Sequence, residues 1–289
     1  MESEIIQQTE RPVTRQSIVA DLRELGVKPG MTLLVHSSLS SLGWVCGGAQ
    51  AVLLALKDAT GESGTLVMPA HSSALSDPAQ WSNPPVPKHW WPEIREQMPA
   101  FDPEMTPTRQ MGAIAELFRT LPGVLRSSHP QFSFAALGPQ AESITANHQL
   151  DMGLGEGSPL ARIYELGGYV LLLGVGHDSN TSIHLAEYRS ASATLTGSTA
   201  SNASKTIVEG APVMHQGQRT WKSIKNLDLN NDDFAEIGQA LEQTNSNDNQ
   251  SAEDVPTVRL GSVGNAQSKL IVQPKLVDFA TKWMVNHRS

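Results

Sequence analysis

The chain has 289 residues, 39% of them hydrophobic, and this length is enough for one large α/β core or two small ones. Its formal net charge is −8 and no basic patch is visible, which argues against nucleic-acid binding and suits a cationic small molecule. The one cysteine, Cys46, excludes an intramolecular disulfide and fits a reducing compartment.

The first part of the chain is predicted to contain a tail, two helices and two strands. Residues 1–12 read as a flexible tail, and they lack the basic and apolar regions of a signal peptide. Thr14 can cap a helix that Gly26 ends and whose apolar face consists of Ile18, Leu22 and Leu25. Strands are predicted over 31–35 and 64–68, with a helix over 49–59 between them.

The segment 70–108 has a different composition. It is rich in proline and carries three of the six tryptophans, Trp81, Trp90 and Trp91. A long irregular segment inside a globular protein is usually either functional or a disordered linker, and the tryptophans argue against disorder. We therefore predict an insert that lines a cleft.

Helices over 112–121 and 159–166 and strands over 132–137 and 168–173 continue the alternation of helices and strands. This alternation indicates an open α/β sheet covered on both faces. The longest apolar run, near 169–175, is far shorter than the roughly 20 residues of a membrane span. We expect a cytoplasmic protein without membrane contact.

Beyond residue 190 the chain becomes polar. Short β-type runs at 206–208 and 212–214 precede a polar loop at about 243–256. An amphipathic helix beginning near Pro274 is predicted to end at about His287. The interpretation is a single domain over 13–289.

Polar side chains follow three of the predicted strands, at His36-Ser37-Ser38, His71-Ser72 and His177-Asp178. Ligands of open α/β sheets bind at the carboxyl ends of the strands, so we expect the cleft there. Hydroxyl and backbone N–H groups at the first position could hold phosphate oxygens, with an ordinary turn as the alternative. The Gly-Lys-Ser/Thr element of a P-loop is missing.

His184 and Glu187 lie three residues apart, so they share one face of the helix expected after 168–173. A histidine beside a carboxylate is a plausible general base next to an anionic site, which suits a cationic substrate. A buried core histidine is the alternative. A metal site needs three or four ligands at recognisable spacing, and the sequence does not support one.

Taken together and in this order, several segments resemble the aminoglycoside 3-N-acetyltransferase family. The matching segments are Leu34-Val-His-Ser-Ser-Leu39, Gly64-Thr-Leu-Val-Met-Pro69, Phe101-Asp-Pro103, Arg126-Ser-Ser-His-Pro130, Ala136-Leu-Gly-Pro139, Gly157-Ser-Pro-Leu-Ala161, Leu171-Leu-Leu-Gly-Val-Gly-His-Asp178 and His184-Leu-Ala-Glu187. The resemblance implies a three-layer α/β/α fold with a central mostly parallel or mixed sheet, distinct from that of the common N-acetyltransferase superfamily.

The resemblance also implies a reaction and its site. An acetyl group would move from acetyl-CoA to the 3-amino group of the deoxystreptamine ring of an aminoglycoside antibiotic, which confers resistance, with His184 as general base. Glu187 would either hold the ring of His184 or face the substrate. The residues implied to meet coenzyme A are His36, Ser37, Ser38, Thr108, Met111 and Gly112. The carboxylates implied to meet substrate ammonium groups are Asp77, Asp102, Asp178, Glu187 and Asp228.

Other interpretations remain open at this point. The same fold could acetylate a different amine, or it could bind coenzyme A without catalysis. A hydrolase using Ser37 with a histidine lacks the Gly-x-Ser-x-Gly elbow. The sequence does not decide between a monomer and a homodimer.

Overall fold

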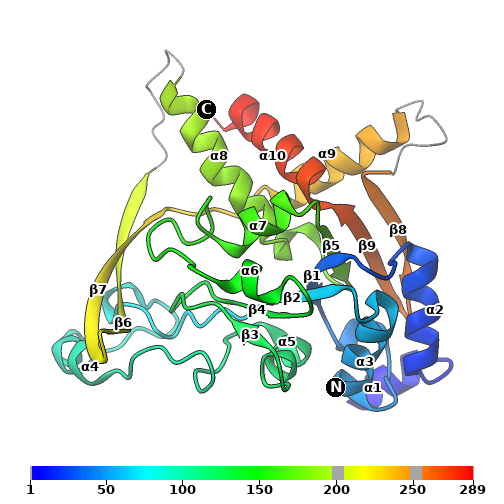
Figure 1. The fold of residues 1–289 in the computed structure, drawn as a ribbon, viewed down its shortest axis with the longest axis horizontal. Helices are drawn as coiled ribbons and strands as arrows, with labels where there is room; N and C mark the ends of the chain where they lie inside the picture. The colour runs from blue at the N-terminus through cyan, green and yellow to red at the C-terminus, as the bar shows by residue number, and fades with distance from the viewer. Residues whose placement is uncertain (1, 197–204, 248–255, 289) are drawn as a thin grey trace.

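A seven-stranded mixed sheet forms the centre of the molecule (Figure 1). The computed structural model describes residues 2–196, 205–247 and 256–288. The strand order is β3-β4-β2-β1-β5-β9-β8. The strands are β1 (Thr32–Ser37), β2 (Thr65–Pro69), β3 (Leu125–Arg126), β4 (Phe134–Leu137), β5 (Tyr169–Leu173), β8 (Val258–Val263) and β9 (Ala266–Val272). The three central strands, β2, β1 and β5, are parallel, and the outer strands pair antiparallel.

Helices cover both faces of this sheet. Alternating side chains of β1 point to opposite sides: Leu33 and Val35 belong to one apolar core and Leu34 to the other. The first core contains α2 (Arg15–Leu25), α3 (Gly48–Thr60) and α5 (Gly112–Arg119). The second contains α6 (Ala141–Thr145), α7 (Pro159–Glu165), α8 (Ser182–Thr196), α9 (Phe234–Asn247) and α10 (Gln273–His287). The predicted three-layer α/β/α fold is confirmed.

Local signals placed the ends of the first long helix correctly. The Thr14 hydroxyl oxygen accepts a hydrogen bond from the backbone N–H of Ser17 at 3.2 Å, as an N-cap does. Gly26 takes the left-handed conformation, with φ of 109°, and ends α2. Ile18, Leu22 and Leu25 are buried, as their spacing predicted.

The polar region beyond residue 190 is more regular than expected. The two short β-type runs are one strand, β6 (Thr206–His215), which pairs with the unpredicted β7 (Gln218–Leu227) in a separate two-stranded ribbon. Its tight turn uses Gln216 and Gly217, both with positive φ. A glutamine is a weak signal for such a turn, which usually has Asn-Gly or Asp-Gly, and this explains why the hairpin was missed.

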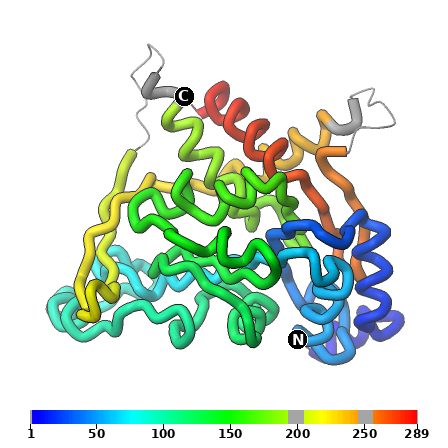
Figure 2. The backbone as a smooth tube through the Cα atoms, in the orientation of Figure 1, coloured from blue at the N-terminus to red at the C-terminus, as the bar shows by residue number. Residues whose placement is uncertain are grey.

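The ribbon lies against the proline-rich insert. Figure 2 shows the cyan-to-teal segment 70–108 running below the yellow ribbon. Within the insert lie η2 (Pro78–Gln80), η3 (Lys88–Trp90) and α4 (Trp91–Gln97). The N–H of Phe101 donates to the carbonyl of Pro212 at 3.1 Å, and Nε of Arg219 donates to the carbonyl of Met98 at 2.6 Å. These bonds tie the end of the insert to β6 and β7.

Two segments expected to be irregular contain helix. Residues 2–8, expected to belong to a loose tail, form helix α1 (Glu2–Gln8), and Thr9 accepts a hydrogen bond from the N–H of Trp44 at 2.9 Å. The first five residues of the polar loop predicted at 243–256 belong to α9, and residues 248–255 lie outside the described residues. Within the described residues, no helix is long and apolar enough to cross a membrane.

Candidate functional site

His184 and Glu187 form a close pair on the first turns of α8, just beyond the carboxyl end of β5. Nδ1 of His184 lies 2.5 Å from Oε2 of Glu187. The Glu187 side chain is 5% exposed and that of His184 17%, so the contact is largely shielded from water. An ionised carboxylate can only accept, so Nδ1 carries the hydrogen. The other ring nitrogen, Nε2, is then the one that can take a proton from a substrate.

The second oxygen of Glu187 is held from two other elements. Oε1 accepts from the backbone N–H of Asn230 at 3.1 Å and from Nη1 of Arg288 at 2.6 Å. Arg288 follows α10, and its guanidinium also binds Asp233. These donors compensate the buried carboxylate for its lost hydration and fix its orientation toward His184.

Two further histidines lie near His184: His36 on β1 and His71 just after β2. His36 is buried at the end of β1, and its Nε2 lies 3.3 Å from the hydroxyl of Thr181. Burial lowers the pKa of His36 to about 3, and nearby His184 adds to this effect. Burial, followed by the proximity of His184 and His36, also holds the pKa of His71 well below its ordinary value. Both rings are therefore neutral at neutral pH. Their positions show that the carboxyl ends of β1, β2 and β5 meet around His184.

A cavity of about 750 Å³ opens beside these strand ends. This volume is within the range of small-molecule sites. One wall follows β1, and others come from the start of α5 and from the loop after β5. Its lining includes five of the six residues predicted to meet coenzyme A: His36, Ser37, Ser38, Met111 and Gly112. Gly112 has φ of 82°, a left-handed conformation that favours glycine.

The sixth predicted residue, Thr108, is placed differently. It does not line this cavity, and both its N–H and its hydroxyl donate to Oε2 of Glu116, at 2.9 and 2.6 Å. Burial acts to raise the pKa of Glu116, but hydrogen bonds from Arg119 and Thr108 bring it down to about 2. The Thr108 hydroxyl therefore serves to hold an ionised carboxylate within the protein.

The predicted substrate carboxylates differ in their surroundings. Asp178 lines the cavity. Asp77 forms an ion pair with Arg95 at 2.7 Å, and exposed Asp228 lies 3.4 Å from Lys205. Asp102 accepts from the N–H groups of Glu104 and Met105 at 2.8 and 2.9 Å, as a turn-forming aspartate does.

Glu209, on β6, is a candidate that sequence reasoning missed. Burial raises the pKa of its carboxyl group, against a hydrogen bond from Gln131, and the nearby charges of Asp228 and Asp77 raise it further. The ribbon therefore brings Glu209 close to two of the predicted carboxylates. No local signal could identify it, because its position depends on the β6–β7 pairing.

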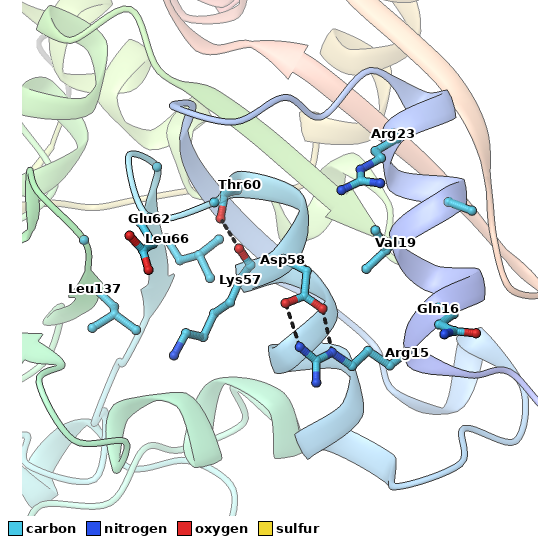
Figure 3. Close-up of a pocket in the computed structure, with 14 residues that line it drawn as sticks. Arg15, Gln16, Val19, Arg23, Lys57, Asp58, Thr60, Glu62, Leu66 and Leu137 are labelled. Carbon is cyan, nitrogen blue, oxygen red and sulfur yellow. Dashed lines mark hydrogen bonds and ion pairs between the residues drawn. The ribbon is translucent and has the colours of Figure 1, made fainter.

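A larger hollow, of about 1050 Å³, lies at the opposite ends of the strands, where β2 begins (Figure 3). It borders the start of β2 and the residue after β4, and an ion pair between Arg15 and Asp58 at 2.5 Å stands at its side. None of the predicted site residues lines it. We therefore place the candidate site at the carboxyl ends of the strands. In the described part of the chain, no group of three or more His, Cys, Asp or Glu side chains is arranged to hold a metal ion.

Known proteins resemble this chain over almost its full length. A family model described as "Aminoglycoside 3-N-acetyltransferase" matches residues 34–285. The aminoglycoside N(3')-acetyltransferase-like protein YokD of Bacillus subtilis is 48% identical, and the match covers 99% of this chain and 97% of YokD. Aminoglycoside N(3)-acetyltransferase VII of Streptomyces paromomycinus is 33% identical, with 97% of this chain and 94% of the relative covered.

Solved structures give the same result. The crystal structure of YokD superposes with a TM-score of 0.89 at 47% identity, covering 99% of this chain and 98% of that one. A binary complex of AAC-IIIb with CoASH has a TM-score of 0.78 at 32% identity, with 96% and 97% covered. AAC-VIa bound to sisomicin has a TM-score of 0.77 at 30% identity, with 95% and 98% covered.

Proposed function

The chain belongs to the aminoglycoside 3-N-acetyltransferase family, and on this basis we propose that it acetylates the 3-amino group of the deoxystreptamine ring of aminoglycoside antibiotics. Acetyl-CoA is the donor and His184 the general base. The reaction takes place in the cytoplasm, and acetylation of the antibiotic confers resistance. The observation that carries this proposal is the 2.5 Å contact between His184 and Glu187 beside the cavity at the strand ends.

The acceptor amine is protonated at neutral pH and has no free lone pair. In this mechanism Nε2 of His184 takes one proton from the ammonium group, and Glu187 stabilises the imidazolium that forms. The freed lone pair attacks the thioester carbonyl carbon. As the new C–N bond forms and the C–S bond breaks, the sulfur takes up the second proton from the nitrogen. Free coenzyme A leaves, and His184 returns its proton to solvent.

The 750 Å³ cavity is the proposed place for coenzyme A. Its hydroxyl groups suit phosphate oxygens or the amides of the pantetheine arm, and Ser38 accepts a hydrogen bond from Ser41 at 2.8 Å, so these hydroxyls already form a small network. The complex of AAC-IIIb with CoASH supports this use of the fold. Thr108 contributes to the proposed cavity indirectly, because its hydroxyl binds Glu116 of α5, the helix that begins at Gly112.

The acceptor is proposed to bind among carboxylates, because an aminoglycoside carries several positive charges. Asp178 lines the cavity and Glu187 contacts the base directly, while Asp77, Asp228 and Glu209 provide negative charge from the insert and from the ribbon. Asp102 is the predicted carboxylate with the most local role, since its side chain holds a turn. The complex of AAC-VIa with sisomicin supports a site of this kind.

A second candidate function keeps the fold and changes the amine. It is favoured by one observation: YokD, at 48% identity, is named only as acetyltransferase-like. The stretches 71–100 and 190–256, which belong to the acceptor side, also contain none of the segments that match the family pattern.

The test is release of free coenzyme A from acetyl-CoA in the presence of gentamicin, tobramycin, neomycin or apramycin. NMR of the product then locates the acetyl group. Acetylation of the 3-amino group is the expected result. Tight coenzyme A binding without release on any of these acceptors would contradict the proposal and favour the second candidate.

A further inference from the structure

Arg288 contacts the carboxylate of the pair formed by His184 and Glu187. His184 Nδ1 contacts one carboxylate oxygen at 2.5 Å, and Nη1 of Arg288 donates to the other at 2.6 Å. We propose that Arg288 is a positioning residue for acetyl transfer, which fixes the Glu187 carboxylate toward His184 and moderates the negative charge that the ring meets. This inference rests on the proposed function, because it assumes that His184 is the base.

Arg288 reaches this place through the packing of two helices. The helices α8 and α10 lie side by side on one face of the sheet (Figure 1). Residue 288 directly follows α10, so this packing brings its side chain to the first turns of α8, where Glu187 lies. The contact joins positions 101 residues apart, which is why no local pattern predicts it.

The guanidinium is itself held in place. Its Nε and Nη2 donate to the two oxygens of Asp233 at 2.7 and 2.5 Å, and Nη2 also donates to the carbonyl of Asn230 at 2.9 Å. Burial acts to lower the pKa of Arg288, but the bonds to Asp233 and Glu187 raise it overall, so the group stays charged. A planar fork can serve Asp233 and Glu187 together, which a lysine ammonium cannot do with the same geometry.

Removal of Arg288 would loosen the carboxylate. Oε1 of Glu187 would keep only the N–H of Asn230, at 3.1 Å, and the side chain could rotate away from His184. The ring would then lose its fixed direction and its defined tautomer. A misplacement of about 1 Å in a catalytic group can cost on the order of 10²-fold in rate.

The positive charge has a separate effect on proton affinity. Among the described residues, the charged or titratable groups near His184 are Glu187 on its own helix, Arg288 with Asp233 behind it, and the histidines at positions 36 and 71. Both of those histidines are neutral through burial, so Arg288 is the cation of this set. Without it, the site loses a nearby positive charge that opposes formation of the His184 imidazolium.

The test compares Arg288→Gln with Arg288→Lys, measuring kcat, the KM for acetyl-CoA and the pH profile of kcat/KM. For R288Q we expect kcat to fall by up to roughly 100-fold with the KM for acetyl-CoA within about twofold. We expect the acid limb of the profile to move to higher pH, because a positive charge close to the base is removed. R288K keeps the charge, so its acid limb should stay at the wild-type position while kcat falls less than in R288Q.

The matched control is Arg15→Gln. This change breaks another bidentate arginine–aspartate pair, with Asp58, which lies beside the hollow at the opposite ends of the strands. It should leave kcat and the pH profile unchanged. Two results would overturn the proposal: wild-type kcat and profile in a folded R288Q, or a loss of kcat with the acid limb unmoved in R288Q, which would reduce Arg288 to a structural tie.

A readout without turnover separates this inference from the proposed function. If the wild-type enzyme acetylates none of the acceptors, the proposed function fails. The ring signals of His184 can still be titrated by NMR in wild-type and R288Q protein. A midpoint that rises in R288Q supports the role of Arg288, and an unchanged midpoint overturns it.

Discussion

Gly238 of α9 packs directly against the ring of His177: a Cβ added to this glycine would lie 2.0 Å from Cγ of the histidine. His177 begins η4 (His177–Ser179), the short turn that leads from β5 into α8. Its Nε2 lies 2.8 Å from Glu242, also on α9, and Lys269 of β9 donates to the same carboxylate. The turn that carries Asp178 toward the cavity is therefore held from behind by α9.

Gly238→Ala should destabilise the protein, although alanine is the better helix former. The gain in helix propensity is about 1 kcal/mol, whereas overpacking of this severity typically costs about 1–3 kcal/mol or more. We expect a lower Tm and a higher KM for acetyl-CoA, because the η4 turn must move. Thermal unfolding and steady-state kinetics measure the two effects.

The double variant Gly238→Ala with His177→Ala provides the control. Removing the ring removes the clash, so the two substitutions should destabilise by less than the sum of their separate effects. Additive effects would show that the close packing of ring and helix is not the cause.

The parts of the fold that were predictable are those with strong local signals. The cap at Thr14, the left-handed Gly26 and the apolar run of β5 each lie within one element, and the structure places these elements as the pattern indicated. The β6–β7 hairpin was missed because its turn residues, Gln216 and Gly217, give a weak signal.

The site residues that could be predicted are likewise those with a local signal in the sequence. His184 and Glu187 could be paired because three residues of helix separate them, and His36 could be placed because β1 ends there. Arg288 and Glu209 could not be found, since each depends on a contact with a distant segment. Thr108 lies close in sequence to Met111 and Gly112, yet its hydroxyl points to Glu116.

His184→Ala should lower kcat by roughly 10²–10⁴-fold, the usual contribution of a general base. The affinity for coenzyme A should change little, because the ring is not among the residues lining the 750 Å³ cavity. Steady-state kinetics and calorimetric titration with coenzyme A would measure these quantities. His215→Ala, at an exposed turn of the ribbon, is the matched control and should keep full activity. Unchanged turnover in H184A would remove the histidine from its assigned role.

Glu187→Gln should weaken acceptor use more than coenzyme A binding. The neutral amide can no longer stabilise the imidazolium of His184, and it faces Arg288 without a compensating charge. We expect a loss in kcat/KM for the aminoglycoside of roughly 10²-fold or more. An equal loss of coenzyme A affinity, measured by the same calorimetric titration, would count against this assignment.

Glu209→Gln should raise the KM for multiply charged acceptors with little change in the KM for acetyl-CoA. The carboxylate lies near Asp77 and Asp228, and removing one charge from this group weakens its attraction for a polycation. An exposed or half-buried ion pair contributes up to about 1 kcal/mol, so we expect an increase of roughly two- to fivefold. Glu62→Gln, at the hollow shown in Figure 3, removes the same charge at the opposite ends of the strands and should not change this KM.

Acid should destabilise the fold through its buried histidines. Burial lowers the pKa of His36 to about 3, of His129 to about 4 and of His148 to about 3, while an unfolded histidine titrates near 6.5. The unfolded chain therefore binds more protons than the native protein between about pH 4 and 6.5. The free energy of unfolding is highest above this window and falls as the pH decreases, by about 1.4 kcal/mol per pH unit for each of these groups.

Urea unfolding at a series of pH values measures this slope. His148→Gln should reduce it by about one proton, because the neutral ring of His148, held between the Ser127 hydroxyl at 2.9 Å and the carbonyl of Gly153 at 2.6 Å, would no longer be present to protonate on unfolding. The exposed His287→Gln change should leave the slope as it is. A slope in H148Q equal to that of the wild type would show that His148 is not kept neutral by its buried position.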